Sequence, residues 1–262
     1  AHSCGIPDEE EVTLDRSTEY ETAPWELSDE AILANLTQLC ESAKAYDDRV
    51  LDASVGLVYQ TYTKMYLSHK KDLIQSVMWT NGSLVVMASR GEEIKDYYKS
   101  YSALGGAELL EEMKKDAEDA AKVVIELLDA QQIEPGEYDC VCAPDVTGMI
   151  VHEAFGHGVE MDMFVKDRAL AARFVGEYVA SPLVTMHDGA AAAAQTATYF
   201  FDDEGTLAQD TIVIEKGILK GGICDSVAAG HLGVRPTGNG RRESYERKAY
   251  TRMTNTFFEG GT

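Results

Sequence analysis

The sequence predicts an α+β fold in which long antiparallel strands with flanking helices precede a mainly β C-terminal part. From Ser54 to Ser68, mostly apolar residues alternate with period two, which is typical of a β-strand. From Leu109 to Leu128, apolar residues recur instead at helical spacing. The predicted elements follow in the order strands, helices and strands, which favours an α+β fold over a doubly wound parallel sheet.

The composition is that of a folded and strongly acidic chain. Its 262 residues include 45 acidic and 23 basic side chains, so the formal net charge is −22. This charge repels nucleic acid and anionic lipid, so we expect neither direct nucleic-acid binding nor a membrane role. The sequence contains no run of ~18 apolar residues that would span a membrane. Its N-terminus lacks the basic and apolar regions of a signal peptide.

The cysteines indicate a reducing compartment. The chain has five of them, an odd number, scattered through a chain too large to need disulfides. Cys140 and Cys142 lie two apart in a predicted strand, so they share one face and are expected to pack in the core. We therefore expect reduced thiols and a cytoplasmic location.

The chain begins with a predicted acidic loop and a helix. The first 27 residues are expected to be irregular, because they contain Asp8-Glu-Glu-Glu11 and then Pro24. Ser28 is a suitable N-cap for a helix, since acidic residues follow it in the first turn. Apolar residues then recur at helical spacing as far as Ala43.

Three antiparallel strands are predicted next. Besides the strand from Ser54 to Ser68, extended stretches cover residues 72–80 and 83–90. Asn81-Gly82 separates these two stretches, and Asn-Gly is a strong signal for a hairpin turn. The long helix follows after Gly105-Gly106, with its apolar stripe opposite charged residues.

Pro135-Gly136 marks the expected boundary between two regions. Residues 1–135 form an N-terminal α+β region with the acidic loop, the helix, the antiparallel strands and the long helix. Residues 136–262 form a second region with a histidine-containing helix and a β-rich C-terminal part. Its predicted elements are a short buried strand over 138–143, a helix opening at Pro144 with Asp145 as cap, a helix over 167–180, and strands over 198–202, 211–215 and 218–220 with a turn at Lys216-Gly217. The pattern does not decide between loop and helix for residues 190–194.

The second region contains a candidate zinc site at His152-Glu-Ala-Phe-Gly-His157. Imidazole nitrogens bind zinc directly, and a neighbouring Glu that is not a ligand can accept a proton from water. The histidines are five residues apart, which at about 100° per residue leaves them about 140° out of line on a regular helix. Both reach one metal only if the helix widens or ends between them, and Gly156 and Gly158 permit this. The helix is therefore expected to be irregular between Glu153 and His157.

The residues from His152 to Glu160 resemble the signature of the TldD/PmbA family of metallopeptidases, also described as modulators of DNA gyrase. Further stretches resemble the family in the same order, and the resemblance extends from about Ser54 to the end of the chain. These stretches are Ala180-Ser-Pro-Leu-Val184, Asp202-Asp-Glu-Gly205, Ile214-Glu-Lys-Gly-Ile-Leu219, Gly238-Asn-Gly-Arg-Arg-Glu-Ser-Tyr245 and Arg252-Met-Thr-Asn-Thr256.

The resemblance implies a TldD/PmbA-like fold and a zinc-dependent peptidase that hydrolyses short or unfolded peptides. It implies that His152 and His157 bind Zn²⁺ and that Glu153 is the general base on a zinc-bound water. The third ligand in the family is a cysteine in a C-terminal segment, expected beyond residue 262. The family also implies a homodimer or a heterodimer with a related subunit. The alternative is a catalytically inactive scaffold or partner subunit that lacks the third ligand.

Two further features have two interpretations each, and a third suggests where a peptide would lie. Glu160 is either a zinc ligand or a group that hydrogen-bonds to a ligand histidine. Arg241 and Arg242 pair either with a substrate carboxylate or with acidic side chains of the surface. The long strands between Ser54 and Arg90 offer an edge on which an extended peptide could lie.

Overall fold

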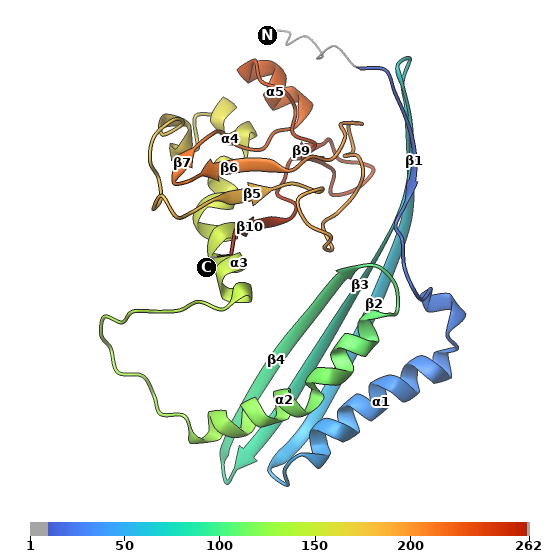
Figure 1. Ribbon diagram of the computed structural model, residues 1–262, viewed down its shortest axis with the longest axis vertical. Coiled ribbons are helices and arrows are strands. Elements are labelled where there is room, and N and C mark those ends of the chain that lie inside the picture. The colour runs from blue at the N-terminus through green and yellow to red at the C-terminus, as the bar shows by residue number, and fades with distance from the viewer. Residues whose placement is uncertain (1–9, 261–262) are drawn as a thin grey trace. The chain divides into compact units, whose positions relative to one another are not determined.

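The computed structural model describes residues 10–260, which form two compact units (Figure 1). The first, called here the helical unit, comprises Thr18–Tyr62 and Val77–Asp139. The second, called the site unit, comprises residues up to Ser17, Thr63–Ser76 and the chain from Cys140 onward. The mixture of antiparallel sheets and helices confirms the α+β fold class. The two-region division at residue 135 stays a prediction.

Two helices cover one face of the sheet in the helical unit (Figure 1). Helix α1 spans Asp29–Ala45, and the Ser28 hydroxyl accepts a hydrogen bond from the Ala31 N–H at 3.2 Å, as an N-cap does. Helix α2 spans Leu109–Asp129. Both helices occur where their periodicity predicts them. The buried core between helices and sheet includes Leu39, Ala43, Leu84, Val86, Met113, Ala117, Ala121, Val124 and Leu128.

The sheet consists of β2 (Val50–Leu67), β3 (Lys71–Arg90) and β4 (Glu93–Leu104). The predicted turn at Asn81-Gly82 is wrong, because β3 runs through both residues as one strand of 20 residues. A Cβ on Gly82 would lie 2.5 Å from the Met113 sulfur, so this glycine lets α2 approach the sheet. The chain reverses instead at Gly91, whose φ is +65°, before the unpredicted strand β4.

Strand β1 (Val12–Ser17) overturns the expectation of an irregular N-terminal segment. It pairs in parallel with residues 71–76 of β3, within the site unit. Its only local signal is the short alternation of Val12 and Leu14, because the partner strand is distant in sequence. Residues 8 and 9 of the acidic run lie outside the described residues, and residues 10 and 11 have no regular structure.

The remainder of the site unit contains a sheet in the order β10-β5-β6-β7. These strands span Thr256–Phe258, Met186–Asp188, Thr211–Glu215 and Ile218–Leu219, and a small separate sheet joins β8 (Gly240–Arg241) to β9 (Tyr250–Thr251). The predicted turn at Lys216-Gly217 is confirmed, since both residues have positive φ values of 47° and 85°. The short helices are α3 (Pro144–Val151), α4 (Met161–Val165), α5 (Ser226–Leu232) and a 3₁₀ turn over Leu170–Arg173.

Five predictions for this region are wrong. Residues 138–143 form no strand, and Cys140 and Cys142 are exposed rather than buried, because no strand in the described chain pairs with them. The predicted helix over 167–180 is reduced to the 3₁₀ turn. Residues 198–202 contain only an isolated bridge, from Phe201 to Leu207. Asp145 lies within the first turn of α3, whose N-cap is Ala143.

The lost helix has a tertiary cause. Gly176 takes a φ of +91°, which ends a right-handed helix. The residues after it bond to the β6–β7 hairpin instead: the Val179 N–H donates to the Gly217 carbonyl at 2.9 Å, and the Leu219 N–H donates to the Glu177 carbonyl at 3.0 Å. Residues 190–194, which the pattern left open, form turns and bends.

A buried carboxylate ties the loops of the site unit to β5. Asp188 is fully buried and accepts hydrogen bonds from the Asn239 amide at 2.8 Å and the Thr254 N–H at 3.1 Å. The hydroxyls of Thr254 and Thr256 donate to it as well. Two stretches of the sequence signature, those at Asn239 and at Thr254 to Thr256, therefore have a structural role.

Asp202 plays a similar part in its own loop. Its carboxylate accepts from the backbone N–H groups of Glu204, Thr206 and Gly240 at 2.8 to 2.9 Å. Burial nevertheless raises the pKa of Asp202 to about 7.

No helix in the described part of the chain is long and apolar enough to cross a bilayer.

Candidate metal centre

The histidine motif follows directly on helix α3. Pro144 occupies the first turn of this helix, where its missing N–H costs nothing. The helix then changes into a π-helical turn over His152–Gly156 and a 3₁₀ turn over His157–Val159. The predicted irregularity between Glu153 and His157 is therefore confirmed.

The π turn brings the two imidazoles together. The His157 N–H donates to the His152 carbonyl, five residues back, which widens the helix at this point. The rings of His152 and His157 have centroids 4.8 Å apart and are nearly perpendicular, at 87°. A regular helix would separate them by about 140°. The five-residue spacing thus becomes compatible with a shared metal.

Gly156 makes the π turn possible against the core. A Cβ at this position would lie 2.1 Å from the Met253 sulfur. Met253 belongs to the buried cluster that also contains Val151 and Val159, which flank the π turn. Gly158 has open space around it, so its lack of a side chain relieves no contact.

The chemistry of these side chains fits part of a zinc site. His152, Glu153 and His157 are all exposed, so their polar atoms are accessible. Two imidazoles supply two of the nitrogen ligands that zinc prefers. No group of three or more potential ligands occurs within residues 10–260. The described residues therefore fit zinc as donors but do not complete its coordination.

Three further histidine and cysteine side chains, Cys224, His187 and His231, do not join the histidine pair within the described residues. Cys224 is fully buried, and burial raises the pKa of its thiol to about 11. His187 lies on β5 between Asp210 and Glu259, with ring nitrogens 2.7 and 3.1 Å from their carboxylates. His231 lies on α5, in the wall of a separate pocket.

Glu160 is a buried carboxylate beside the histidines. Its Oε1 lies 3.5 Å from His157 Nδ1 and has no hydrogen-bond partner among the described residues. Its other oxygen, Oε2, lies 3.4 Å from Arg252 Nη1. Burial raises the pKa of Glu160, although the charges of Arg252 and His157 oppose this. Arg252 was not singled out as a site residue, although it begins one of the signature stretches.

The backbone around Glu160 is held by residues 222 and 223. The Ile223 N–H donates to the Val159 carbonyl at 3.0 Å, and the Met161 N–H donates to the Ile223 carbonyl at 2.9 Å. A Cβ on Gly222 would lie only 2.1 Å from the Val159 oxygen. The absence of a side chain at residue 222 is thus required for this close approach.

We expect Gly222→Ala to lower the free energy of unfolding by about 1–3 kcal/mol, because a backbone oxygen cannot move aside as a side chain can. Urea-induced unfolding of the variant and the parent protein measures this difference. Gly221→Ala is the matched control, since a Cβ at residue 221 meets nothing within 4 Å. Equal losses in both variants would contradict the steric explanation.

The arginines of the signature do not pair with surface carboxylates. Arg241 Nη1 donates to the Met253 carbonyl at 2.8 Å, and Arg242 Nη1 donates to the Arg247 carbonyl at 2.9 Å. No acidic side chain of the described chain lies within 4.0 Å of either guanidinium group. The interpretation of these arginines as ordinary surface ion pairs is therefore wrong.

The sequence is similar to those of known metalloproteases. The family model of the PmbA/TldA metallopeptidase C-terminal domain matches residues 135–262. A TldD homolog metalloprotease from Buchnera aphidicola is 37% identical over 145 residues, covering 55% of this chain and 30% of that protein. A metalloprotease from Methanothermobacter thermautotrophicus is 30% identical over 220 residues, covering 82% of this chain and 47% of that protein. A zinc metalloprotease TldD homolog from Saccharolobus solfataricus is 26% identical over 232 residues, covering 88% of this chain and 51% of that protein. The chain spans about half the length of these relatives or less.

The backbone is similar to those of two solved structures. A protein from Thermotoga maritima, described as a modulator of a DNA gyrase, superimposes with a TM-score of 0.79 at 21% identity, covering 92% of this chain and 54% of that one. TldE from Thermococcus kodakarensis gives a TM-score of 0.72 at 20% identity, covering 98% of this chain and 60% of that one. At these identities the similarity concerns the fold.

Proposed function

Because this chain belongs to the TldD/PmbA family of metallopeptidases, we propose that it acts as a zinc-dependent peptidase on short or unfolded peptides. The observation that carries the proposal is the π turn, which places the His152 and His157 rings 4.8 Å apart with Glu153 between them in sequence. The metalloprotease names of the relatives support the same reaction class, and one of these relatives is named a zinc enzyme.

His152 and His157 would hold the zinc ion through their ring nitrogens. When bound, zinc polarises a peptide carbonyl and lowers the pKa of water. The third protein ligand is proposed to be the cysteine expected beyond residue 262.

Glu153 acts as the general base. Its carboxylate is exposed on the π turn and forms no hydrogen bond or ion pair within residues 10–260, so it is available to water. It accepts a proton as the water oxygen attacks the scissile carbonyl carbon. It then donates that proton to the amine nitrogen as the carbon–nitrogen bond breaks. One water is consumed, and a carboxylate and an amine are released.

Glu160 is proposed to position His157 rather than to bind metal. Its buried carboxylate lies 3.5 Å from Nδ1, so an Nδ1–H can point toward it while Nε2 remains free for zinc. A carboxylate that faces a ligand histidine in this way selects the tautomer and the ring orientation.

The edge of the sheet is proposed as the surface on which an extended peptide lies. Strand β2 is at one end of its sheet, and in the described chain no strand covers its outer edge. Backbone groups along such an edge can pair with a substrate strand. We further propose a cytoplasmic location and a dimer with an identical or related subunit, for which the similarity to a TldE structure is the support.

A non-catalytic scaffold is the second candidate, because the described residues supply only two zinc ligands. Zinc content separates the two candidates. The full-length protein, dialysed against metal-free buffer, is expected to retain close to one zinc per chain and to cleave short fluorogenic peptides. Chelation should abolish cleavage, and added zinc should restore it. A full-length protein without zinc or activity would establish the scaffold instead.

The 262-residue chain alone is expected to lose its zinc on dialysis, since two histidines leave two positions of a tetrahedral ion open. Stoichiometric zinc in this chain would show that a residue within it completes the site.

A further inference from the structure

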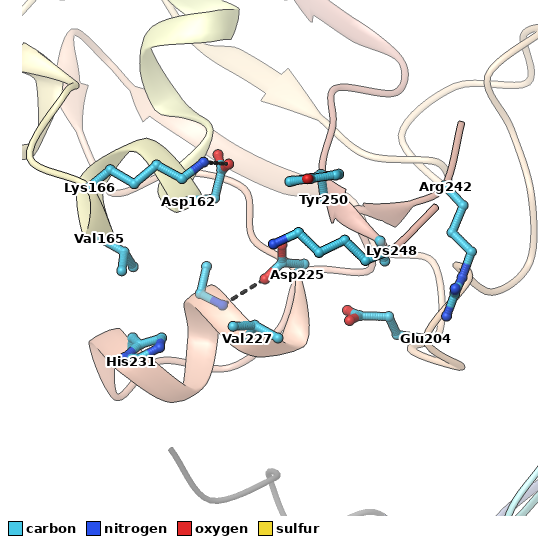
Figure 2. Close-up of a pocket in the computed structure, with 12 residues that line it drawn as sticks. Asp162, Val165, Lys166, Glu204, Asp225, Val227, His231, Arg242, Lys248 and Tyr250 are labelled. Atoms are coloured by element: carbon cyan, nitrogen blue, oxygen red, sulfur yellow. Dashed lines mark hydrogen bonds and ion pairs between the residues drawn. The ribbon is translucent and has the colours of Figure 1, made fainter. Parts of the chain in front are cut away.

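A pocket of about 260 Å³ lies in the site unit, and Asp162, five residues after His157, is one of its lining residues. Figure 2 shows Lys166 and Asp162 on one side of it and Arg242 and Glu204 on the other, with Lys248 and Tyr250 between them. A chain of contacts links it to the histidines. Arg252 lies 5.5 Å from the Tyr250 ring centroid and 3.4 Å from Glu160, which in turn faces His157.

The acidic side chains of the pocket have partners within the protein. Asp162 Oδ2 pairs with Lys166 Nζ at 2.7 Å (Figure 2). Asp225 caps α5 by accepting from the Ala228 N–H at 2.6 Å. Glu204 accepts from the Ser226 N–H at 2.7 Å. Asp162 is therefore paired with a cation, whereas Asp225 and Glu204 are hydrogen-bonded to neutral backbone N–H groups.

Two cations of the pocket, Lys248 and Arg242, have no ion pair with a carboxylate of the described chain. The Lys248 ammonium lies 4.5 Å from the Tyr250 ring centroid, and no carboxylate of the described chain is within 4.0 Å of it. The Arg242 guanidinium donates only to a neutral acceptor, the Arg247 carbonyl. In a chain of net charge −22, two unpaired cations lining one pocket indicate a site for an external anion.

The pocket also offers an acceptor. Asp162 is only 8% exposed, and its Oδ1 has no hydrogen-bond partner within residues 10–260. A buried acceptor without a partner is costly, and a ligand N–H can satisfy it. A ligand that carries both a carboxylate and N–H groups, as a peptide does, matches this combination better than a simple anion.

We propose that Lys248 and Arg242 form a subsite for a carboxylate of the peptide substrate. The subsite rests on the proposed peptidase function and deepens it, because it would hold one end or one acidic side chain of the peptide in the unit that carries the histidine pair. The mixed lining and the strongly negative net charge disfavour nucleic acid as the ligand.

Peptide binding tests the subsite without requiring turnover. The full-length protein carrying Glu153→Gln is titrated against N-terminally fluorescein-labelled penta-alanine with a free C-terminus, and against the same peptide as the C-terminal amide. Fluorescence anisotropy gives the two dissociation constants. We expect the free carboxylate to bind about tenfold more tightly, as one charge-assisted contact contributes.

Two substitutions test whether Lys248 and Arg242 cause the preference for the free carboxylate. Lys248→Gln and Arg242→Gln, each added to the Glu153→Gln protein, are expected to remove most of the tenfold preference. Lys220→Gln is the matched control, because Lys220 is an exposed lysine of the same unit that pairs with Glu215 and does not line the pocket. Thermal melts confirm that each variant is folded. The control should keep the full preference.

A third peptide distinguishes the two sources of the carboxylate. If an amidated Ala-Ala-Glu-Ala-Ala peptide binds as tightly as free penta-alanine, and Lys248→Gln abolishes this tight binding, the subsite binds an acidic side chain. If the amidated Glu-containing peptide binds weakly, the subsite binds the terminal carboxylate. Three results would overturn the subsite. The first is equal binding of free and amidated penta-alanine, with no tighter binding of the Glu-containing peptide. The others are binding of no peptide at all, or a preference for the free carboxylate that survives both substitutions. Failure of the full-length protein with its native Glu153 to cleave peptides, with the carboxylate preference intact, would overturn only the proposed function.

Discussion

Glu153→Gln is expected to lower kcat for peptide hydrolysis by about 10²–10⁴, while the zinc content of the full-length protein stays unchanged. An amide is similar in shape to a carboxylate but cannot accept a proton from water. Glu153 is exposed and forms no hydrogen bond or ion pair in the described chain, so the substitution removes no structural contact. Steady-state kinetics and metal analysis on the same preparation measure both effects.

His152→Ala is the contrasting variant. It removes one of few ligands, so zinc and activity should be lost together. If Glu153→Gln also lost zinc, Glu153 would be a ligand or a structural partner of the site. If it kept full activity, the assignment of the base would be wrong, and Glu160 or a residue beyond Thr262 would have to take that role.

Asp188→Ala is expected to lower the free energy of unfolding by about 3–5 kcal/mol. Asp188 is fully buried and accepts from Asn239, Thr254 and Thr256, so its removal leaves several buried donors without partners. Burial raises the pKa of this carboxyl, against the hydrogen bonds that lower it. Urea-induced unfolding at pH 7 measures the loss.

Asp72→Ala is the control for this variant. Asp72 is an exposed residue of β3 in the same unit, and a substitution at such a position usually changes stability by less than about 0.5 kcal/mol. Equal destabilisation by the two substitutions would show that the network around Asp188 contributes nothing specific.

Asp188→Ala should also weaken the packing of β10 on β5, since Thr256 and Asp188 are register partners.

Features that depend on neighbouring residues in sequence were predictable. The N-cap at Ser28 and the apolar stripe of α2 specify their helices through contacts within one or two turns. The irregular helix at His152 could be predicted as well, because the five-residue spacing and Gly156 constrain the same few residues. Two imidazoles on one short segment were therefore recognisable as a candidate metal site before any distance was known.

Other glycines and apolar runs were misinterpreted because their partners are distant in sequence. Gly82 follows Asn81, as in a hairpin turn, yet its role is to admit Met113 of α2. Residues 138–143 have the apolar composition of a short buried strand but no strand in the described chain to pair with. A glycine or an apolar run states what the backbone is able to do, and the packing partner determines which possibility is used.

The sequence by itself determined the α+β class, the two principal helices, the zinc-binding histidine pair as a candidate and the irregular turn that carries it. Only the tertiary structure decided that Glu160 is buried against His157, that Arg241 and Arg242 donate to backbone carbonyls, and that Lys248 and Tyr250 line a pocket next to Asp162. The physical reason is the range of the interactions. Helix periodicity, capping and motif geometry act within a few residues. Burial and charge pairing depend instead on segments that folding brings together from distant parts of the chain, as with Glu160 and Arg252, which are 92 residues apart.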